Sequence, residues 1–377
     1  MPARPALPRF GIEEECFLID PASLDLAREV PLGFSHACRG VLGEAVAEEI
    51  FQCQYELVSP VLRELGEAAA FLADRRRRLR LIAKSYGLDT LCVAAHPFTR
   101  QHRQSPAFRP RYRRLFEEEG AVARQSLLNG LHVHVEVCGV DRVQVMNCVL
   151  PWMPLLLALS ASSPFWDGAD TGLASYRQSL CGEWPRMGPP PRFANEAAWR
   201  RYVALLLQYG LMDEPGHTWW FLRPSARYPT LELRITDACP RIDDALCIAG
   251  LFRLLVAHAR DAREPADPHW QRALLAENFW QARRHGGAAR FLVEGDRLVK
   301  PRDWLEQARL AVGEWLDEEG ERLFVHAGRI IDEGNSAERQ RAVRLAALAK
   351  GRTERGALSA VVRHLQEENR RPPDCSD

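Results

Sequence analysis

The sequence predicts an α+β fold in which about six mostly antiparallel strands form one sheet, helices pack on one face of it, and the last third is helical. Two observations lead to this prediction. In the first two-thirds of the chain, short segments with two-residue alternation are interleaved with segments of helical periodicity. From about residue 240 only helical periodicity remains. The 377 residues are enough to bury a large core without disulfides or a structural metal.

The predicted strands are bounded by turn-forming residues. The first, 9–20, ends at Asp20-Pro21, and the third, 88–95, leads into His96-Pro97-Phe98, where proline stops strand pairing. The segments with strand alternation are 9–20, 49–59, 88–95, 131–137, 218–223 and 230–236.

The predicted helices include one that is strongly apolar, 143–161, and is expected to be central. The full set is 63–86, 109–118, 143–161, 197–209, 242–260, 269–284, 302–319, 323–333, 337–350 and 355–369. An arginine cluster at 75–80 is expected to lie on a solvated outer face of the first helix. The segment 162–193 is rich in Pro, Gly, Ser and Trp, which is typical of a long functional loop. We expect a single domain over 1–370 and a disordered tail over 371–377.

Composition excludes several classes of protein. Fifty Lys and Arg balance fifty Asp and Glu, which argues against a nucleic-acid-coating protein. The longest apolar run, 149–161, contains two prolines and is shorter than the roughly 20 residues that span a bilayer, so no membrane helix is expected. Ten scattered cysteines without a CxxC pair are typical of a reducing cytosol, where they serve as buried small hydrophobic residues, with Cys375 exposed in the tail.

Charged and polar residues recur at a spacing of two along four predicted strands. Because alternate residues of a strand share a face, Glu13 and Glu15 lie on one face of the sheet and Glu14 on the other. The same spacing groups Gln52, Gln54 and Glu56; His132 and His134; and Glu232 and Arg234. Uncompensated carboxylates are not buried in a dry core.

Two interpretations of this face are open. It is either the solvated side of an antiparallel sheet or a cleft where cations and a polar substrate neutralise the carboxylates. Carboxylates accompanied by His and Arg favour Mg²⁺ and phosphate groups. For His132 and His134, a zinc site with Cys138 and a plain hydrogen-bonded pair are further alternatives.

Taken together, the motifs resemble the carboxylate-amine ligases of the type 2 glutamate-cysteine ligase group. The segments that carry the resemblance are FGIEEECFLID (10–20), FQCQYE (51–56), HPF (96–98), GLHVHV (130–135), SPFWDGADT (163–171), ASYR (174–177), RPS (223–225), TLELRITD (230–237) and ENFWQARRHG (277–286). They occur in the family's order over roughly residues 9–300.

The resemblance implies a glutamine synthetase/guanido kinase-like fold whose concave sheet face holds ATP, Mg²⁺ and an amino acid. It implies a reaction in which ATP phosphorylates the side-chain carboxylate of glutamate, after which an amine, such as that of cysteine, displaces the phosphate. Such a fold explains why the chain has no P-loop pattern.

The resemblance also implies roles for individual residues. The predicted metal ligands are Glu13, Glu15, Glu56 and Glu232, with Glu56 alternatively holding the substrate ammonium. The predicted catalytic residues are Arg177, Arg223 and Arg234, which steady the phosphoryl group or substrate carboxylate, and His132 and His134 along the phosphate path. A surface ion pair is the alternative for Arg177. Asn278 and Arg284, with Glu56, are predicted to bind the nucleotide, although the first two lie about 240° apart around a helix, so that at most one faces the ligand.

Two departures from the family pattern concern the second substrate. Glu136 follows the His-x-His-Val unit, and Phe221 stands where some members have Asp. A metal-dependent amidohydrolase that uses His132 and His134, and a catalytically idle binding protein, are the alternative functions. We expect small-molecule substrates, no nucleic-acid or membrane partner and a cytoplasmic location. A homodimer is an open alternative, since the helical third offers spare surface.

Overall fold

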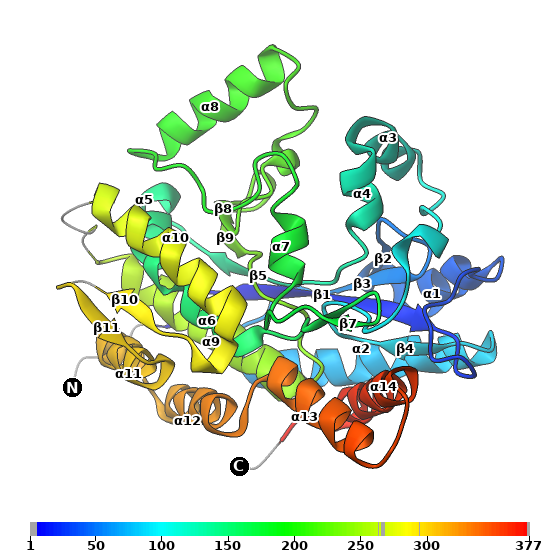
Figure 1. Ribbon diagram of the computed structural model, residues 1–377. Helices are drawn as coiled ribbons and strands as arrows, with labels where there is room; N and C mark the ends of the chain where they lie inside the picture. Colours follow the sequence, from blue (N-terminus) through cyan, green and yellow to red (C-terminus); the bar gives the residue numbers. More distant parts are fainter. Residues whose placement is uncertain (1–5, 263, 265–267, 294, 375–377) are drawn as a thin grey trace.

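One antiparallel sheet organises the molecule (Figure 1). The computed structural model describes residues 6–262, 264, 268–293 and 295–374. Along the sheet the strand order is β2-β3-β1-β5-β9-β8, and β4 pairs with the C-terminal end of β1. The strands are β1 (Phe10–Ile19), β2 (Val46–Glu48), β3 (Gln54–Val58), β4 (Asp89–Leu91), β5 (Leu131–Glu136), β8 (Leu222–Pro224) and β9 (Thr230–Leu233). The predicted fold class is therefore confirmed.

The prediction of one strand over 49–59 is wrong in its first half. Residues 49–53 form the turn of a hairpin, and only the part from Gln54 to Val58 is a strand. β2 and β3 pair with each other, and the N–H of Glu49 donates to the carbonyl of Gln54 (3.1 Å) at the turn. Phe51 and Cys53 are buried within this turn, so apolar alternation continues through it and imitates one long strand. Gln52 consequently does not lie on a strand with Gln54 and Glu56. β4 and β8 are also shorter than predicted.

The apolar face of the sheet rests on helices. Ile12, Val133 and Leu231 belong to one core with α2 (Leu65–Ser85), α5 (Arg142–Val149), α6 (Met153–Ser160) and α9 (Ile242–Ala259). The apolar segment Arg142–Ser160 has the length and composition of a membrane span, yet 78% of its window is buried inside the protein. It is a core element, and Pro151 and Pro154 divide it into α5, a 3₁₀ turn and α6.

On the opposite side of β1 lie shorter elements, as Figure 1 shows. They are α3 (Pro110–Glu119), α4 (Ala121–Gln125), α7 (Arg177–Cys181) and α8 (Glu196–Gln208). The segment predicted to be a long loop contains α7 and a small hairpin, β6 (Phe165–Trp166) with β7 (Ala169–Asp170). The remaining helix of the first third is α1 (Phe34–Leu42).

The last third is helical, as predicted, with one addition. Its helices are α10 (Pro268–His285), α11 (Pro301–Ala311), α12 (Glu318–Glu333), α13 (Ser336–Ala349) and α14 (Glu354–Arg370), and a hairpin of β10 (Phe291–Val293) with β11 (Arg297–Val299) was not predicted. The side chain of Asn369 in α14 bonds both the N–H and the carbonyl of Cys92, which ties the C-terminal helix to the edge of the sheet. Residues 371–374 of the predicted tail are described, and 375–377 lie outside the described residues.

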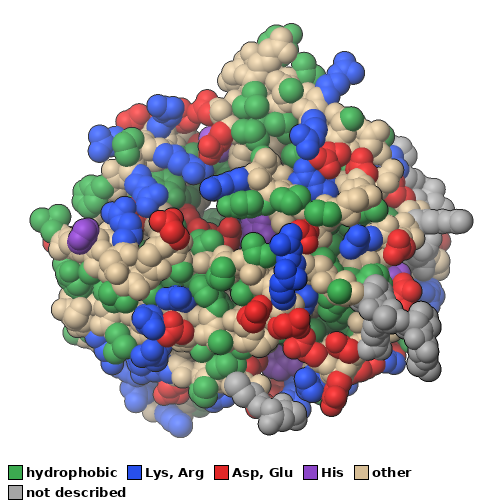
Figure 2. All heavy atoms as spheres, turned by 180° about the vertical axis from the view of Figure 1, so that it is seen from behind, with side chains coloured by type: hydrophobic (Ala, Val, Ile, Leu, Met, Phe, Trp, Pro, Cys, Tyr) green, Lys and Arg blue, Asp and Glu red, His purple; other side chains and the backbone are tan. Residues whose placement is uncertain are grey.

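Cysteine usage differs from the prediction. Cys16 and Cys92 form a disulfide, and Cys138 is exposed. The two disulfide partners are 76 residues apart, and the pairing of β1 with β4 brings them together. No spacing signal in the sequence marks such a pair. Cys375 lies outside the described residues. Charges of both signs are mixed over the face seen in Figure 2, in keeping with a net charge of zero.

Candidate active site

A row of charged side chains crosses five neighbouring strands. Strand register sets Glu15 opposite Glu56 and Glu13 opposite His132. It also sets His134 opposite Glu232, and Glu232 opposite Arg223. Directly opposed residues of antiparallel strands have neighbouring side chains. The structure thus brings together the residues that alternation placed on one face.

Glu14 points to the other face, as predicted. It is fully buried and accepts a hydrogen bond from Nε of Arg76 (2.7 Å). Arg76 also donates to the carbonyls of Cys239 (2.7 Å) and Pro240 (2.6 Å). The expectation that the arginine cluster at 75–80 is solvated is therefore wrong at Arg76, because a buried carboxylate requires a buried cation.

Glu232 is held by two arginines. Its carboxylate accepts two bonds from Arg223 (2.8 and 2.9 Å) and one from Arg234 (2.5 Å). Burial opposes ionisation, but the charges of Arg223 and Arg234 bring the pKa of Glu232 well below its ordinary value. Arg223 also donates to the carbonyls of Gly216 and Thr218 (2.7 and 2.8 Å), so its orientation is fixed. The guanidinium of Arg234 forms no other hydrogen bond with the described residues, which leaves its remaining N–H groups available for a ligand.

Two histidines flank Glu13. Nδ1 of His132 lies 3.6 Å and Nε2 of His134 lies 3.5 Å from its carboxylate oxygens. Burial alone would raise the pKa of Glu13, but the two neighbouring histidines lower it. Burial and the charge of Arg234 lower the pKa of His132, whereas Glu13 and Glu232 raise the pKa of His134 against the effect of burial. Nε2 of His132 is buried without a hydrogen-bond partner among the described residues.

A second carboxylate cluster lies around Glu15. Glu15 accepts the N–H of Gly130 (2.6 Å). Burial and the charge of Glu15 raise the pKa of Glu49 to about 8, and burial and the charge of Glu13 raise that of Glu56. Glu49 was not predicted as a site residue, because strand alternation over 49–59 assigns it to the face opposite Glu56. Only recognition of the turn would have corrected that assignment.

The donor set fits Mg²⁺. Within the row, two sets of three residues each bring their ligand atoms within 4.8 Å of one another: Glu13, His132 and Glu232; and Glu15, Glu56 and His132. Their donors are mainly hard carboxylate oxygens, which Mg²⁺ prefers. The raised pKa values of Glu49 and Glu56 show that the arginines do not neutralise this side of the row, so additional positive charge would be favourable.

The ion pair considered for Arg177 is present, with Asp237 at 3.8 Å, but it is buried and does not lie on the surface. Arg177 donates to the carbonyls of Ile235 (3.3 Å) and Thr236 (3.1 Å). A Cβ built on Gly130 would lie 2.5 Å from Nη2 of Arg177 and 2.8 Å from Nε2 of His132. Arg177 therefore lies next to His132, and the absent side chain of Gly130 makes that approach possible.

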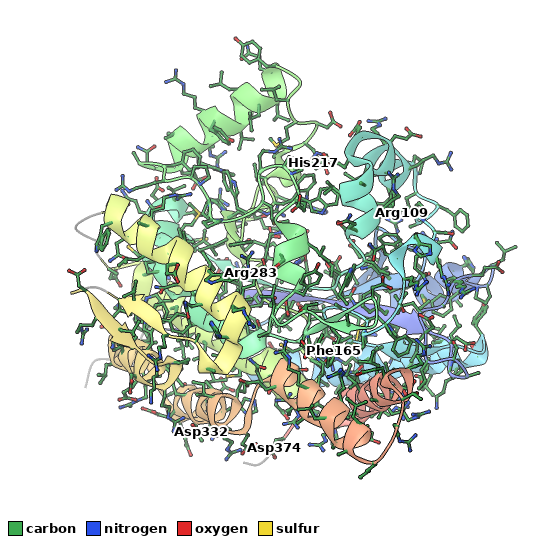
Figure 3. The ribbon with its side chains drawn as sticks, in the orientation of Figure 1. Arg109, Phe165, His217, Arg283, Asp332 and Asp374 are labelled. Carbon is green, nitrogen blue, oxygen red and sulfur yellow. A yellow bond between two sulfur atoms is a disulfide. The ribbon has the colours of Figure 1, made fainter. Side chains whose placement is uncertain are left out.

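Asp237 anchors the loop that carries Arg177. It accepts the N–H of Ser162 (2.9 Å) and the hydroxyls of Ser163 (2.8 Å) and Ser175 (2.9 Å). α10 supports the same loop, since the carbonyl of Arg283, labelled in Figure 3, accepts the N–H groups of Ala174 and Ser175. Three serines and one carboxylate thus fix the loop against the end of β9.

The two residues predicted on α10 have different surroundings. The amide of Asn278 bonds both the N–H and the carbonyl of Leu292 (2.8 and 2.7 Å), which secures β10. Arg284 is half-buried, and its guanidinium lies 3.6 Å from where a Cβ of Gly172 would be, beside the 162–193 loop. Asn278 is not brought into the charged row.

The departures from the family pattern also have definite positions. Glu136 pairs with Arg9 at the end of β5. Phe221 is in the apolar core, with its ring 5.0 Å from that of Phe279. Among the described residues, no group of metal-type ligands contains Cys138 or both His132 and His134.

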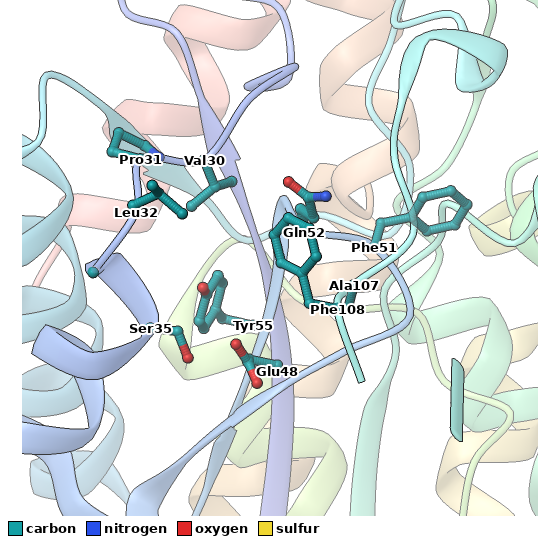
Figure 4. Close-up of a pocket in the computed structure, with 11 residues that line it drawn as sticks. Val30, Pro31, Leu32, Ser35, Glu48, Phe51, Gln52, Tyr55, Ala107 and Phe108 are labelled. Carbon is teal, nitrogen blue, oxygen red and sulfur yellow. The ribbon is translucent and has the colours of Figure 1, made fainter. Parts of the chain in front are cut away.

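A hollow elsewhere on the protein is separate from the row (Figure 4). It lies beside the β2–β3 hairpin and has exposed Leu32 and Phe108 at its edge. The one acid that lines it, Glu48, is paired with Arg109 (2.8 Å). Its apolar lining and neutralised acid offer no site for phosphate or metal.

Comparison with known proteins agrees with the geometry. The model of glutamate-cysteine ligase family 2 matches residues 9–364. The chain belongs to this family. A relative from Pseudomonas paraeruginosa is 53% identical over 365 residues, covering 96% of both chains, and one from Ectopseudomonas mendocina is 44% identical over 368 residues, covering 97% of both. Both carry the name glutamate–cysteine ligase 2 as a provisional assignment.

Solved structures confirm the fold. Glutamate–cysteine ligase of Francisella tularensis in complex with AMP matches with a TM-score of 0.72 at 13% identity, covering 97% of this chain and 90% of that one. A bifunctional glutathione synthetase of Pasteurella multocida matches with a TM-score of 0.71 at 13% identity, covering 96% of this chain and 53% of that one. At this identity the likeness concerns the fold.

Proposed function

We propose that the protein is an ATP-dependent carboxylate-amine ligase that joins the side-chain carboxylate of glutamate to an amine, with cysteine as the first acceptor to test. The observation that supports it most is the row in which Glu13, Glu15, Glu56 and Glu232 stand beside Arg223, Arg234 and His132. Family membership and the AMP complex of the Francisella relative support the ATP-dependent step.

The reaction has two steps. First, a carboxylate oxygen of glutamate attacks the γ-phosphorus of ATP, the bond to the bridging oxygen breaks, and ADP leaves. Second, the amine nitrogen attacks the acyl carbon, phosphate leaves, and the amine loses a proton to a base. Phosphoryl transfer of this kind depends mainly on positioning and charge neutralisation, which is what the row provides.

We assign Mg²⁺ to Glu13, Glu15, Glu56 and Glu232, of which Glu232 must share its carboxylate with two arginines. When bound, Mg²⁺ would neutralise phosphate oxygens and hold them in position. Arg234, with N–H groups to spare, is suited to the transferring phosphoryl group, and Arg223 orients Glu232. His132 is neutral near pH 7, because its pKa is lowered, so its unpartnered Nε2 is suited to a hydrogen bond with substrate.

Glu49 is the candidate base for the acceptor amine. Its carboxyl belongs to the same cluster as Glu15 and Glu56 and is not among the residues assigned to Mg²⁺, so it is available to take the proton that the amine loses. Arg177 lies next to His132 and holds the chain that follows β9 in place. We retain ATP, glutamate and an amine as the substrates, and the cytoplasm as the location.

The experiment is a screen for ADP release. The purified protein is incubated with ATP, Mg²⁺ and glutamate, and single amines are added, beginning with cysteine. We expect ADP and amide product in equal amounts only when an amine is present, and loss of both in Glu13→Gln. Stoichiometric zinc together with amide hydrolysis in the absence of ATP would favour the amidohydrolase. Absence of amine-dependent ADP with every amine would reject the proposal.

A further inference from the structure

A second hollow lies on the back of the sheet, on the side of β1 that carries Glu14. It is formed by α2, β4, the start of α9 and the end of α14, and its cavity volume is about 230 Å³. Five of the residues that line it are arginines, and none is Asp or Glu. The five are Arg76, Arg77, Arg80, Arg370 and Arg371.

Three of these arginines have acidic partners outside the lining. Arg76 pairs with Glu14, Arg77 with Asp74 (3.1 Å) and Arg370 with Asp89 (2.8 Å). Arg80 and Arg371 form no side-chain hydrogen bond or ion pair with the described residues. Two arginines without a counter-charge therefore line one concave space, and like charges gathered in this way attract an anion.

The arginines are brought together by specific contacts. Gln366 and Arg370 of α14 both bond the carboxylate of Asp89 on β4 (3.2 and 2.8 Å). After α14, the N–H of Asp374, labelled in Figure 3, donates to the carboxylate of Asp243 in the first turn of α9 (2.8 Å). These bonds hold Arg371 and the neighbouring wall of the hollow against α9.

The lining also fits the body of a small organic molecule. Ile242, Pro372 and the disulfide-bonded Cys92 are apolar, and Thr90 adds a hydroxyl. A concave site with a few polar groups and an apolar wall is typical of small-molecule binding. A long nucleic acid would instead need an extended basic surface, which a chain of zero net charge does not favour.

We propose that this hollow binds a small organic anion with two or more phosphate or carboxylate groups, held by Arg80 and Arg371 with support from Arg77 and Arg370. The planar guanidinium binds both oxyanions in a bidentate manner, so phosphate and carboxylate are the shared chemistry. The site is distinct from the charged row. Arg76, in its wall, also holds Glu14 of the strand that carries Glu13 and Glu15 on its other face.

The test is calorimetric titration of the full chain with three probes: inorganic phosphate, ADP and citrate. Four proteins are compared: the wild type, the Arg80→Ser/Arg371→Ser double variant, Arg78→Ser and Glu13→Gln. Arg78 lies on the same helix, pairs with Asp74 and does not line the hollow, so its variant is the matched control. ADP is expected to bind both in the hollow and at the charged row. The titration with ADP therefore measures the number of binding sites as well as the affinity.

We expect at least one probe to bind the wild type, Arg78→Ser and Glu13→Gln with equal affinity. The same probe should bind the double variant at least about tenfold more weakly, because two charge-assisted hydrogen bonds are lost. For ADP the double variant should lose one of two sites. Phosphate or ADP binding identifies a phosphorylated ligand, and citrate binding a carboxylate. If the double variant does not fold, Arg371→Ser alone is compared with Arg78→Ser. Equal binding by variant and wild type, or loss of every site in Glu13→Gln, would overturn the proposal. So would the absence of binding by all three probes. The result does not depend on ligase activity.

Discussion

Glu14 and Arg76 form a buried ion pair directly behind the strand face that carries Glu13 and Glu15. Their side chains are 0% and 5% exposed, so the pair is shielded from water. Because Arg76 also binds the carbonyls of Cys239 and Pro240, it ties β1 to α2 and to the start of α9. Adjacent acids of one strand thus have different roles. Glu14 anchors β1 to the helices behind it, and Glu13 and Glu15 face the candidate active site.

Removing one partner of this pair should destabilise the protein strongly. We expect Arg76→Met to lower the free energy of unfolding by about 3–5 kcal/mol, because an unpaired carboxylate would stay buried. Arg77→Met, next to it on α2 and largely exposed, should cost less than about 1 kcal/mol. Urea unfolding of both variants measures the difference, and equal losses would contradict the structural role of Glu14.

Replacing Glu232 should impair the reaction. Glu232→Gln leaves Arg223 and Arg234 without their carboxylate, so we expect the rate of amide formation to fall about 100- to 1000-fold, as on removal of one organising polar group from an active site. Glu136→Gln, on the same face but paired with Arg9 at the strand end, should keep its rate. Steady-state kinetics with both variants test this, and similar rates for the two would argue against the row.

A methyl group at Gly130 should displace side chains of the candidate active site. The added Cβ would lie 2.5 Å from Arg177 and 2.8 Å from His132, so Gly130→Ala must displace one of them. We expect a large loss of activity. Gly40→Ala in α1, where nothing lies within 4 Å of the new Cβ, should retain activity and gain about 0.5–1 kcal/mol of stability. Full activity of Gly130→Ala would show that the approach of Arg177 to His132 is unimportant.

Acid should weaken the attachment of α14. Burial opposes ionisation of Glu368, but His364, 3.5 Å away, and the charges of Arg339 and Arg241 lower its pKa to about 2. A lowered pKa gives stability that is present above the unfolded value near 4.5 and lost as pH falls towards 2. That loss amounts to about 3 kcal/mol, at 1.36 kcal/mol per pKa unit. Glu368→Gln should be less stable at pH 7 and show a flatter decline in denaturant titrations between pH 5 and pH 3. A decline as steep as that of the wild type would assign the acid sensitivity to other groups.

The disulfide can be checked by counting thiols. Denatured protein, prepared without reductant, should react with two equivalents fewer than its ten cysteines, and Cys92→Ser should remove the difference by freeing Cys16. If all ten thiols react in the unreduced wild type, Cys16 and Cys92 are unbonded, as the cysteine pattern of the sequence alone predicts.

Local alternation was sufficient where strands were regular. Sequence alternation placed Glu13 with Glu15 on one face of their strand, and His132 with His134 on one face of theirs, because residues two apart on a strand share a face whatever the strand pairs with. The resemblance added Arg177 and Arg223, whose neighbours depend on a loop and a short strand. The order and register of strands, which set His134 opposite Glu232, are not encoded locally.

The remaining features depend on long-range contacts. Glu49 was missed because apolar residues continue through the β2–β3 turn. Arg76 was assigned to solvent because a run of arginines on a helix usually faces water, and only the position of Glu14 reverses that preference. Asn278 was predicted to bind nucleotide within a family motif, whereas its amide secures Leu292.

Phosphorylation of a substrate carboxylate at the charged row can be followed by the transfer of an oxygen atom. Glutamate labelled with ¹⁸O in its side-chain carboxylate is converted in the presence of ATP, Mg²⁺ and cysteine, and the released phosphate is analysed by mass spectrometry. We expect one labelled oxygen to pass from glutamate to each phosphate. Amide formation with unlabelled phosphate, or no amide with any acceptor amine, would contradict it.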